Sequence, residues 1–140
     1  MKMIGVIVLF FLVGADAKAD VFHDFFKNHR ILFFFASTCP YCHQQAPILK
    51  AWSSHHDAVI EAYSFDGLPL QEFSNIHALN TALVNVAFQG SAIRYPALFI
   101  INQQTQAIYP VSIGALSEVE LSDRFRQLIS KIMAYEGVSS

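Results

Sequence analysis

Four stretches of the chain have the composition of β-strands. Ile31–Ala36 and Ala97–Ile101 are continuously apolar, which is typical of strands covered on both faces of a sheet. Ala58–Phe65 and Ala107–Ile113 mix apolar with polar residues. Pro110 in the last stretch favours an edge strand, because proline has no N–H to donate to a neighbouring strand.

Apolar residues at helical spacing predict four helices. Their ranges are Val21–Asn28, about Cys39–Ser53, Ala78–Phe88 and Ser117–Tyr135. In the last of these, Ser117 and Glu120 match a capping box, and Gly137 follows the predicted end. Its apolar face comprises Leu121, Phe125, Leu128, Ile132 and Tyr135. Pro47 is expected to kink the second helix, and Gly90 is expected to cap the third.

The order of these elements predicts an α/β fold. After a leading helix, the chain reads strand, helix, strand, helix, strand, strand, helix. This order indicates a mixed sheet flanked by helices. A length of 140 residues suits one domain. The formal net charge is −2 and no basic run is present, so we expect no nucleic-acid partner.

The N-terminus has the features of a secretory signal peptide. A short positive start precedes the apolar run Ile4–Val13, and small-residue cleavage patterns follow at Ala15–Ala17 and Ala17–Ala19. The run is shorter than the ~20 residues of a membrane-spanning helix. We expect a signal peptide over residues 1–19 and a mature domain over residues 20–140. An uncleaved N-terminus that rests on a membrane is the alternative.

The candidate chemistry lies in Cys39-Pro40-Tyr41-Cys42, which contains both cysteines of the chain. The motif follows a predicted buried strand and opens a helix, whose N-terminus stabilises a thiolate. We expect exposed Cys39 to attack a substrate disulfide and Cys42, one turn further, to resolve the mixed disulfide. Pro40 and Tyr41 would tune the thiolate. His43 either stabilises that thiolate when protonated or is simply a solvent-facing helix residue.

Three other interpretations of the cysteines are less favoured. The Cys39–Cys42 motif with His43 matches the c-type haem attachment pattern, but it follows a strand, and only Met133 is placed to be a second ligand. The same cysteines with His55 have zinc-finger spacing, but the next histidine is the adjacent His56. A pair of inert buried thiols is the third. We therefore expect no metal and no cofactor.

The motif and its surroundings resemble the thioredoxin superfamily over nearly the whole mature chain. The strand before the Cys39–Cys42 motif, Pro47, Pro96 and the segment Gly114–Ser117 all fall where that family has them. The resemblance implies a thioredoxin-like fold with a cis Pro96. It also implies that the backbone of Tyr95 pairs with bound substrate. The segment before this loop is longer than in thioredoxin and reads as a helical insertion.

A narrower resemblance points to the disulfide isomerases of F-type conjugative transfer systems, the TrbB family. The similar segments are Thr38–Gln44, Ala46–Lys50, Tyr63–Gly67 and Leu98–Asn102. This resemblance implies a periplasmic protein that acts on disulfides of exported proteins, including components of pilus assembly. An isomerase would also need a membrane thiol electron donor. The stretch from Asp20 to Arg30 has no room for a dimerisation domain, so we expect a monomer. A chaperone that only holds substrates is the alternative.

Two residues depart from the family pattern. Phe33 occupies the position at which thioredoxins have a buried aspartate for proton transfer, so water, His43 or another group would have to serve Cys42. Tyr95 stands where the periplasmic isomerases usually have threonine, which is expected to change the redox potential or the substrate fit. The direction of electron flow, and hence the choice between isomerase, reductase and oxidase, stays open.

Overall fold

The computed structural model describes residues 17–137 of the chain. Its elements, in chain order, are α1 (Ala17–Asn28), β1 (His29–Phe35), α2 (Pro40–His55), β2 (Ile60–Ser64), β3 (Ile76–His77), α3 (Thr81–Phe88), β4 (Ala97–Asn102), β5 (Ile108–Ile113) and α4 (Glu118–Tyr135). The signal peptide predicted over residues 1–19 falls almost entirely outside the described residues. Cleavage after Ala19 would remove the first three residues of α1.

The five strands form one mixed sheet in the order β3-β2-β1-β4-β5. β1 pairs in parallel with β2 and antiparallel with β4. β2 pairs in parallel with β3, and β4 antiparallel with β5. The predicted α/β fold with a mixed sheet is confirmed, and the strand that carries Pro110 is an edge strand as predicted.

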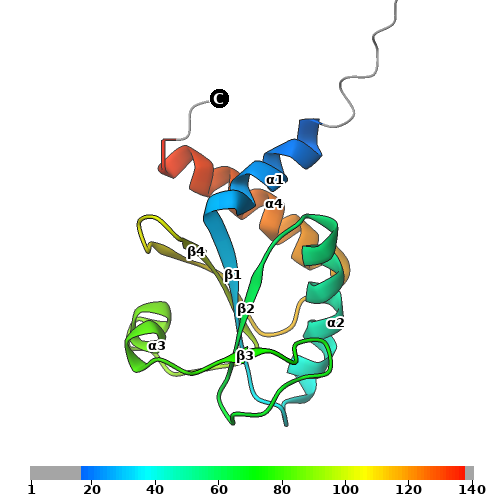
Figure 1. Ribbon diagram of the computed structural model, residues 1–140, viewed down its shortest axis with the longest axis vertical. Helices are drawn as coiled ribbons and strands as arrows, with labels where there is room; N and C mark the ends of the chain where they lie inside the picture. The colour runs from blue at the N-terminus through cyan, green and yellow to red at the C-terminus, as the bar shows by residue number, and fades with distance from the viewer. Residues whose placement is uncertain (1–16, 138–140) are drawn as a thin grey trace, which may run out of the picture.

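Side chains of β1 alternate between two apolar layers. Ile31, Phe33 and Phe35 face the layer formed with α1, α2 and α4. Leu32 and Phe34 face the layer formed with α3, which lies on the opposite side of the sheet (Figure 1). All five side chains are fully buried, and each contributes about 1.5–3 kcal/mol of transfer free energy.

The prediction for the segment between β2 and β4 was partly wrong. The insertion is not mainly helical: α3 has only eight residues, and residues 65–75 form turns and bends. The two-residue strand β3 was missed, because so short a strand leaves no alternating pattern. α3 is capped by Gln89, whose φ is +52°, one residue before the predicted cap Gly90. α2 continues through Pro47 from Pro40 to His55.

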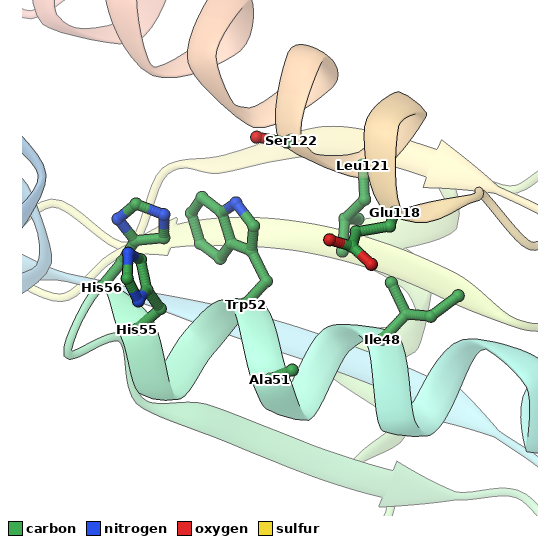
Figure 2. A pocket seen from close by; sticks show the side chains of 8 residues that line it. All are labelled: Ile48, Ala51, Trp52, His55, His56, Glu118, Leu121 and Ser122. Atoms are coloured by element: carbon green, nitrogen blue, oxygen red, sulfur yellow. The ribbon is translucent and has the colours of Figure 1, made fainter.

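α2 and α4 lie next to each other on one face of the sheet, and a hollow opens between them (Figure 2). The cavity has a volume of about 490 Å³, and Trp52 and His55 of α2 and Leu121 of α4 are among its lining residues. Trp52 stacks on Phe125 with ring centroids 4.2 Å apart. No helix among residues 17–137 is long and apolar enough to cross a membrane.

α4 confirms the predicted capping box but corrects the predicted apolar face. Ser117 and Glu120 exchange the two capping hydrogen bonds. Leu121, Phe125, Ile129 and Ile132 are the buried residues of the helix, so Ile129 takes the place predicted for Leu128. Tyr135 is 81% exposed. Four residues beyond Ile132, just past the end of the helix, the same face continues to the half-buried Glu136.

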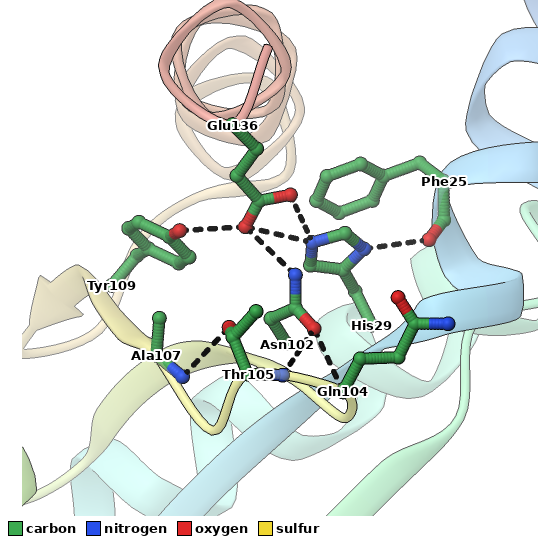
Figure 3. Close-up of polar contacts among 8 residues, drawn as sticks. All are labelled: Phe25, His29, Asn102, Gln104, Thr105, Ala107, Tyr109 and Glu136. Atoms are coloured by element: carbon green, nitrogen blue, oxygen red, sulfur yellow. Dashed lines mark hydrogen bonds and ion pairs between the residues drawn. The ribbon is translucent and has the colours of Figure 1, made fainter. Parts of the chain in front are cut away.

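Glu136 belongs to a polar cluster at the end of the sheet opposite the cysteines (Figure 3). Its carboxylate accepts hydrogen bonds from Tyr109 Oη at 2.6 Å, Asn102 Nδ2 at 3.0 Å and His29 Nε2 at 3.0 Å. His29 Nδ1 lies 2.9 Å from the carbonyl oxygen of Phe25. Both ring nitrogens of His29 therefore face oxygen atoms. The cluster joins the α1–β1 junction to β4, β5 and α4.

The hydrogen-bond donors around Glu136 favour the ionised form of its carboxyl group. Burial alone would raise the pKa of its carboxyl group, but hydrogen bonds from Asn102 and Tyr109 and the charge of His29 outweigh it and lower that pKa. The ionised form therefore stabilises the fold above the ordinary value of 4.5, and this contribution is lost as the pH falls through the lowered pKa.

We predict that Glu136→Ala lowers the free energy of unfolding by about 3 kcal/mol at pH 7, because it leaves His29 buried without its partner. Tyr109→Phe removes one hydrogen bond and should cost about 1 kcal/mol. Glu118→Ala, at the exposed start of the same helix, should cost about 0.5 kcal/mol. Urea unfolding at pH 7 and at pH 3 measures these differences. Equal costs of Glu136→Ala at both pH values would contradict the assignment.

Candidate active site

Three segments converge at one end of the sheet because of the register of its strands. β1 and β2 run in parallel and end together, with Phe35 opposite Ser64. β4 runs antiparallel to β1, so its start, Ala97, lies opposite Phe34 at the same end of the sheet. The Cys39 turn, the loop after β2 and the loop before β4 therefore meet there.

Cys39 forms the N-cap of α2, and its sulfur lies against the start of the helix. The N–H of Cys42 donates to Cys39 Sγ over 3.1 Å, and the N–H of Cys39 donates to the Ala36 carbonyl over 3.1 Å. Both thiols are free; Cys39 is half-buried and Cys42 is fully buried. This order of exposure is the one that an attacking Cys39 and a resolving Cys42 require. Pro40 occupies the first helical position, and Tyr41 is 62% exposed.

The environment of Cys42 disfavours its thiolate. Burial, above all, raises the pKa of the Cys42 thiol to about 12. The hydrogen bond with Cys39 and the negative charges of Cys39 and Asp66 act in the same direction, whereas the backbone of Ala36 opposes them. At neutral pH Cys42 therefore carries its proton.

The loop before β4 lies beside the attacking sulfur. The Tyr95–Pro96 peptide bond is cis, which confirms that prediction. The carbonyl oxygen of Tyr95 lies 4.0 Å from Cys39 Sγ, and Pro96 is buried. The Tyr95 ring stacks on Phe65 with centroids 5.5 Å apart. The Pro96 carbonyl accepts the N–H of Gly114 over 2.7 Å, which ties this loop to the approach of α4.

Gln45 joins that approach to α2, a contact that the sequence interpretation missed. Its Oε1 accepts the N–H of Leu116 over 2.7 Å, and its Nε2 donates to the Leu116 carbonyl over 3.3 Å. Gln45 is fully buried. Its position in the sequence could have identified it. Gln45 follows Cys42 by three residues and precedes Ala46, on the buried face of α2.

The side chain of His43 forms a hydrogen bond with the turn before the motif. Its Nε2–H donates to the Ser37 carbonyl over 2.6 Å, since a carbonyl oxygen can only accept. The side chain is exposed, as one of the two interpretations of this residue expected. It also anchors the Ser37 backbone, two residues before Cys39.

Asp66 is the second residue that the sequence interpretation missed, because Asp66-Gly67 was taken only as a turn. Its carboxylate accepts hydrogen bonds from Ser37 N at 3.0 Å, Ser37 Oγ at 2.6 Å, Ser64 Oγ at 2.8 Å and Leu68 N at 3.2 Å. These bonds, led by the one from the Ser37 hydroxyl, hold the pKa of Asp66 well below its usual range. Asp66 could have been identified from its position just after β2, at the end of the sheet where the motif lies.

The zinc alternative does not fit the geometry. His55 ends α2, about 24 Å along the helix axis from its start at the cysteines, and lines the hollow between α2 and α4 (Figure 2). The two cysteines and His55 thus cannot share one ion. Among residues 17–137, no group of three or more histidine, cysteine or acidic side chains could hold a metal. Met133, named for haem, packs against the core on α4.

Solved structures with a similar fold include two thioredoxins. The thioredoxin of Aeropyrum pernix matches with a TM-score of 0.52 and 21% identity, covering 79% of this chain and 82% of that one. The exposed lipoprotein thioredoxin Etrx1 of Streptococcus pneumoniae matches with a TM-score of 0.52 and 14% identity, covering 79% and 89%. These likenesses establish the thioredoxin-like fold, as the sequence resemblance implied.

Sequence comparisons assign the chain to a narrower family than the fold does. Protein TrbB of Escherichia coli K12 is 26% identical over 86 residues, which cover 61% of this chain and 48% of that protein. The chain therefore spans about half the length of this curated relative. A family model described as TraF, F plasmid transfer operon protein, matches residues 14–126. The chain belongs to this TraF family, with a thioredoxin-like fold and its cysteine pair at Cys39 and Cys42.

Proposed function

We propose that this protein is a thiol–disulfide oxidoreductase, acting as an isomerase or reductase on disulfides of exported proteins. The observation that carries the proposal is the asymmetry of the cysteine pair. Cys39 is only half-buried at a helix N-terminus, whereas Cys42, one turn further, is fully buried. The Tyr95 carbonyl beside Cys39 adds a backbone acceptor for an extended substrate segment.

The reaction follows from this placement. The Cys39 thiolate attacks one sulfur of a substrate disulfide, forms a mixed disulfide and releases the first substrate thiolate. Cys42 then gives its proton to solvent and attacks Cys39 Sγ. The Cys39–Cys42 disulfide forms and the second substrate thiolate leaves. The substrate gains two electrons, and the cysteine pair loses them. In isomerisation, a substrate thiol attacks the mixed disulfide instead, and the pair stays reduced.

Ionisation of Cys42 contributes nothing to an oxidising role. Strong oxidants of this type have a stabilised reduced form. Here the pKa of Cys42 is raised to about 12, so its ionisation adds nothing to the stability of the reduced pair at neutral pH. A pair that must be reduced in an oxidising compartment needs an electron donor, for which we propose a thiol protein of the membrane.

The place of action that we propose is the periplasm, during assembly of a conjugative transfer system. The TraF family match and the similarity to TrbB support the link to conjugation. The signal-peptide pattern of residues 1–19 supports export and cleavage. The substrates would be disulfide-containing components of pilus assembly. The protein would act on them as a monomer.

We predict that Cys42→Ala accumulates mixed disulfides on Cys39, because the resolving thiol is gone. Incubation of the reduced variant with a disulfide-scrambled ribonuclease, followed by acid quenching and non-reducing mass spectrometry, measures them. Cys39→Ala should form none, since buried Cys42 is not accessible. Adducts on Cys42 of the Cys39→Ala variant, at the level seen on Cys39, would contradict the assigned roles.

The Cys39→Ala variant also distinguishes redox turnover from the holding of substrates by a chaperone. We predict that Cys39→Ala abolishes reactivation of scrambled ribonuclease, at least a hundredfold below the wild-type protein. A holding chaperone would retain its effect on aggregation and on transfer without Cys39. Full complementation of a transfer defect by Cys39→Ala would therefore overturn the oxidoreductase proposal.

In donor cells, we predict that Cys42→Ala traps proteins encoded by the transfer operon and that the mature protein begins at Asp20. Diagonal gels of periplasmic extracts with mass spectrometry identify the trapped partners, and N-terminal sequencing identifies the mature end. Trapping of unrelated exported proteins alone would contradict the role in conjugation.

A further inference from the structure

The buried amide of Gln45 binds both backbone groups of a single residue. Its Oε1 accepts the Leu116 N–H over 2.7 Å, and its Nε2 donates to the Leu116 carbonyl over 3.3 Å. These partners fix the orientation of the amide, because a backbone N–H can only donate and a carbonyl oxygen can only accept. Leu116 lies between β5 and α4, outside both elements. Gln45 therefore supplies there the partners that a strand or helix would supply elsewhere.

The same segment is bonded to the loop before β4. The pairing of β4 with β5 ends one residue before Gly114, and the Gly114 N–H donates to the Pro96 carbonyl over 2.7 Å. Gly114 has a φ of +97°, a left-handed conformation that glycine adopts without strain, at the point where the chain leaves β5. Two residues later the chain reaches Gln45 through Leu116. The segment from Gly114 to Leu116 thus connects the loop before β4 with α2.

These contacts close a ring that includes the attacking sulfur. Pro96 follows Tyr95, whose carbonyl oxygen lies 4.0 Å from Cys39 Sγ. Cys39 is the N-cap of α2, and Gln45 lies on the buried face of the same helix, about two turns further along. Loss of the Gln45 amide would open this ring between α2 and Leu116. The cysteine and the carbonyl beside it would then be held to each other less firmly.

We propose that Gln45 is a positioning residue whose two hydrogen bonds hold the Tyr95 carbonyl at the distance from Cys39 that an extended polypeptide substrate requires. Such a substrate can donate a backbone N–H to this carbonyl while its disulfide meets Cys39 Sγ. A small disulfide without a flanking backbone needs only the sulfur. Gln45 thus favours polypeptide disulfides over small ones. The inference rests on the proposed thiol–disulfide exchange and concerns the selection of its substrates.

Two probes with the same leaving group test this selection. One is an extended peptide whose single central cysteine is joined through a disulfide to thionitrobenzoate, and the other is N-acetylcysteine amide joined to the same group. In each, the Cys39 thiolate attacks the cysteine sulfur of the probe, a new disulfide forms and the coloured thiolate leaves. Later resolution by Cys42 releases no colour. Stopped-flow absorbance at increasing probe concentration gives the maximal rate and the half-saturating concentration.

Gln45→Met keeps the length of the side chain but makes neither hydrogen bond. We expect it to raise the half-saturating concentration of the peptide about fivefold, as the loss of one backbone hydrogen bond would, and to change the reaction of the small probe less than about twofold. Gln44→Met, the same substitution at the exposed neighbour, should affect neither probe. Ser53→Ala removes a buried hydrogen bond further along α2 and should leave the ratio of the two rates unchanged.

Gln45→Glu gives a second readout, which decides the matter if Gln45→Met does not fold. A protonated carboxyl group accepts one hydrogen bond and donates another, as the amide does, whereas an ionised one cannot donate to the Leu116 carbonyl. Burial raises the pKa of such a carboxyl group. The ratio of peptide rate to small-probe rate should therefore match that of the wild-type protein at about pH 5 and fall below it at about pH 9. Ionisation of Cys39 affects both probes and cancels from the ratio.

The outcomes distinguish failure of this inference from failure of the proposed function. If neither probe reacts with Cys39 of the wild-type protein, the oxidoreductase proposal itself is wrong. If both probes react and Gln45→Met changes their rates equally or not at all, only the role of Gln45 is overturned. A rate ratio of Gln45→Glu that follows the wild-type ratio at every pH would overturn it as well.

Discussion

Burial of β1 on both of its faces is the constraint on which the rest of the structure depends. Ile31, Phe33 and Phe35 require a layer of helices on one side, and Leu32 and Phe34 require another on the opposite side. A slip of one residue would exchange these faces, so the register with β2 and β4 is strongly specified. That register brings the end of β2 and the start of β4 to the cysteines.

The chemistry of the pair follows from this placement. Cys39 is at the helix start, where its sulfur accepts the Cys42 N–H, and Cys42 lies under the turn, where desolvation disfavours its charge. The surrounding loops are joined to one another and to α2 by backbone and side-chain hydrogen bonds, through Gln45, Gly114 and Ser37. A pair of identical residues thus acquires two different chemical characters from its surroundings.

The features predicted from the sequence are those with a local pattern or a resemblance. Apolar runs located β1 and β4, the capping box located α4, and the resemblance supplied the cis Pro96. Asp66 and Gln45 were missed because their partners lie 29 and 71 residues away, and no periodicity reports such contacts. Helical spacing suggested Tyr135 as the last core position, but the polar cluster around Glu136 ends that face.

The reduction potential of the Cys39–Cys42 pair tests the central claim most directly. The account predicts a value between about −270 and −180 mV, the range of thioredoxin and protein disulfide isomerase, because the proposed reductase or isomerase must donate electrons to substrate disulfides. Equilibration with glutathione at pH 7, followed by alkylation and mass spectrometry, measures it. A value near −120 mV, that of a strong periplasmic oxidant, would contradict the account.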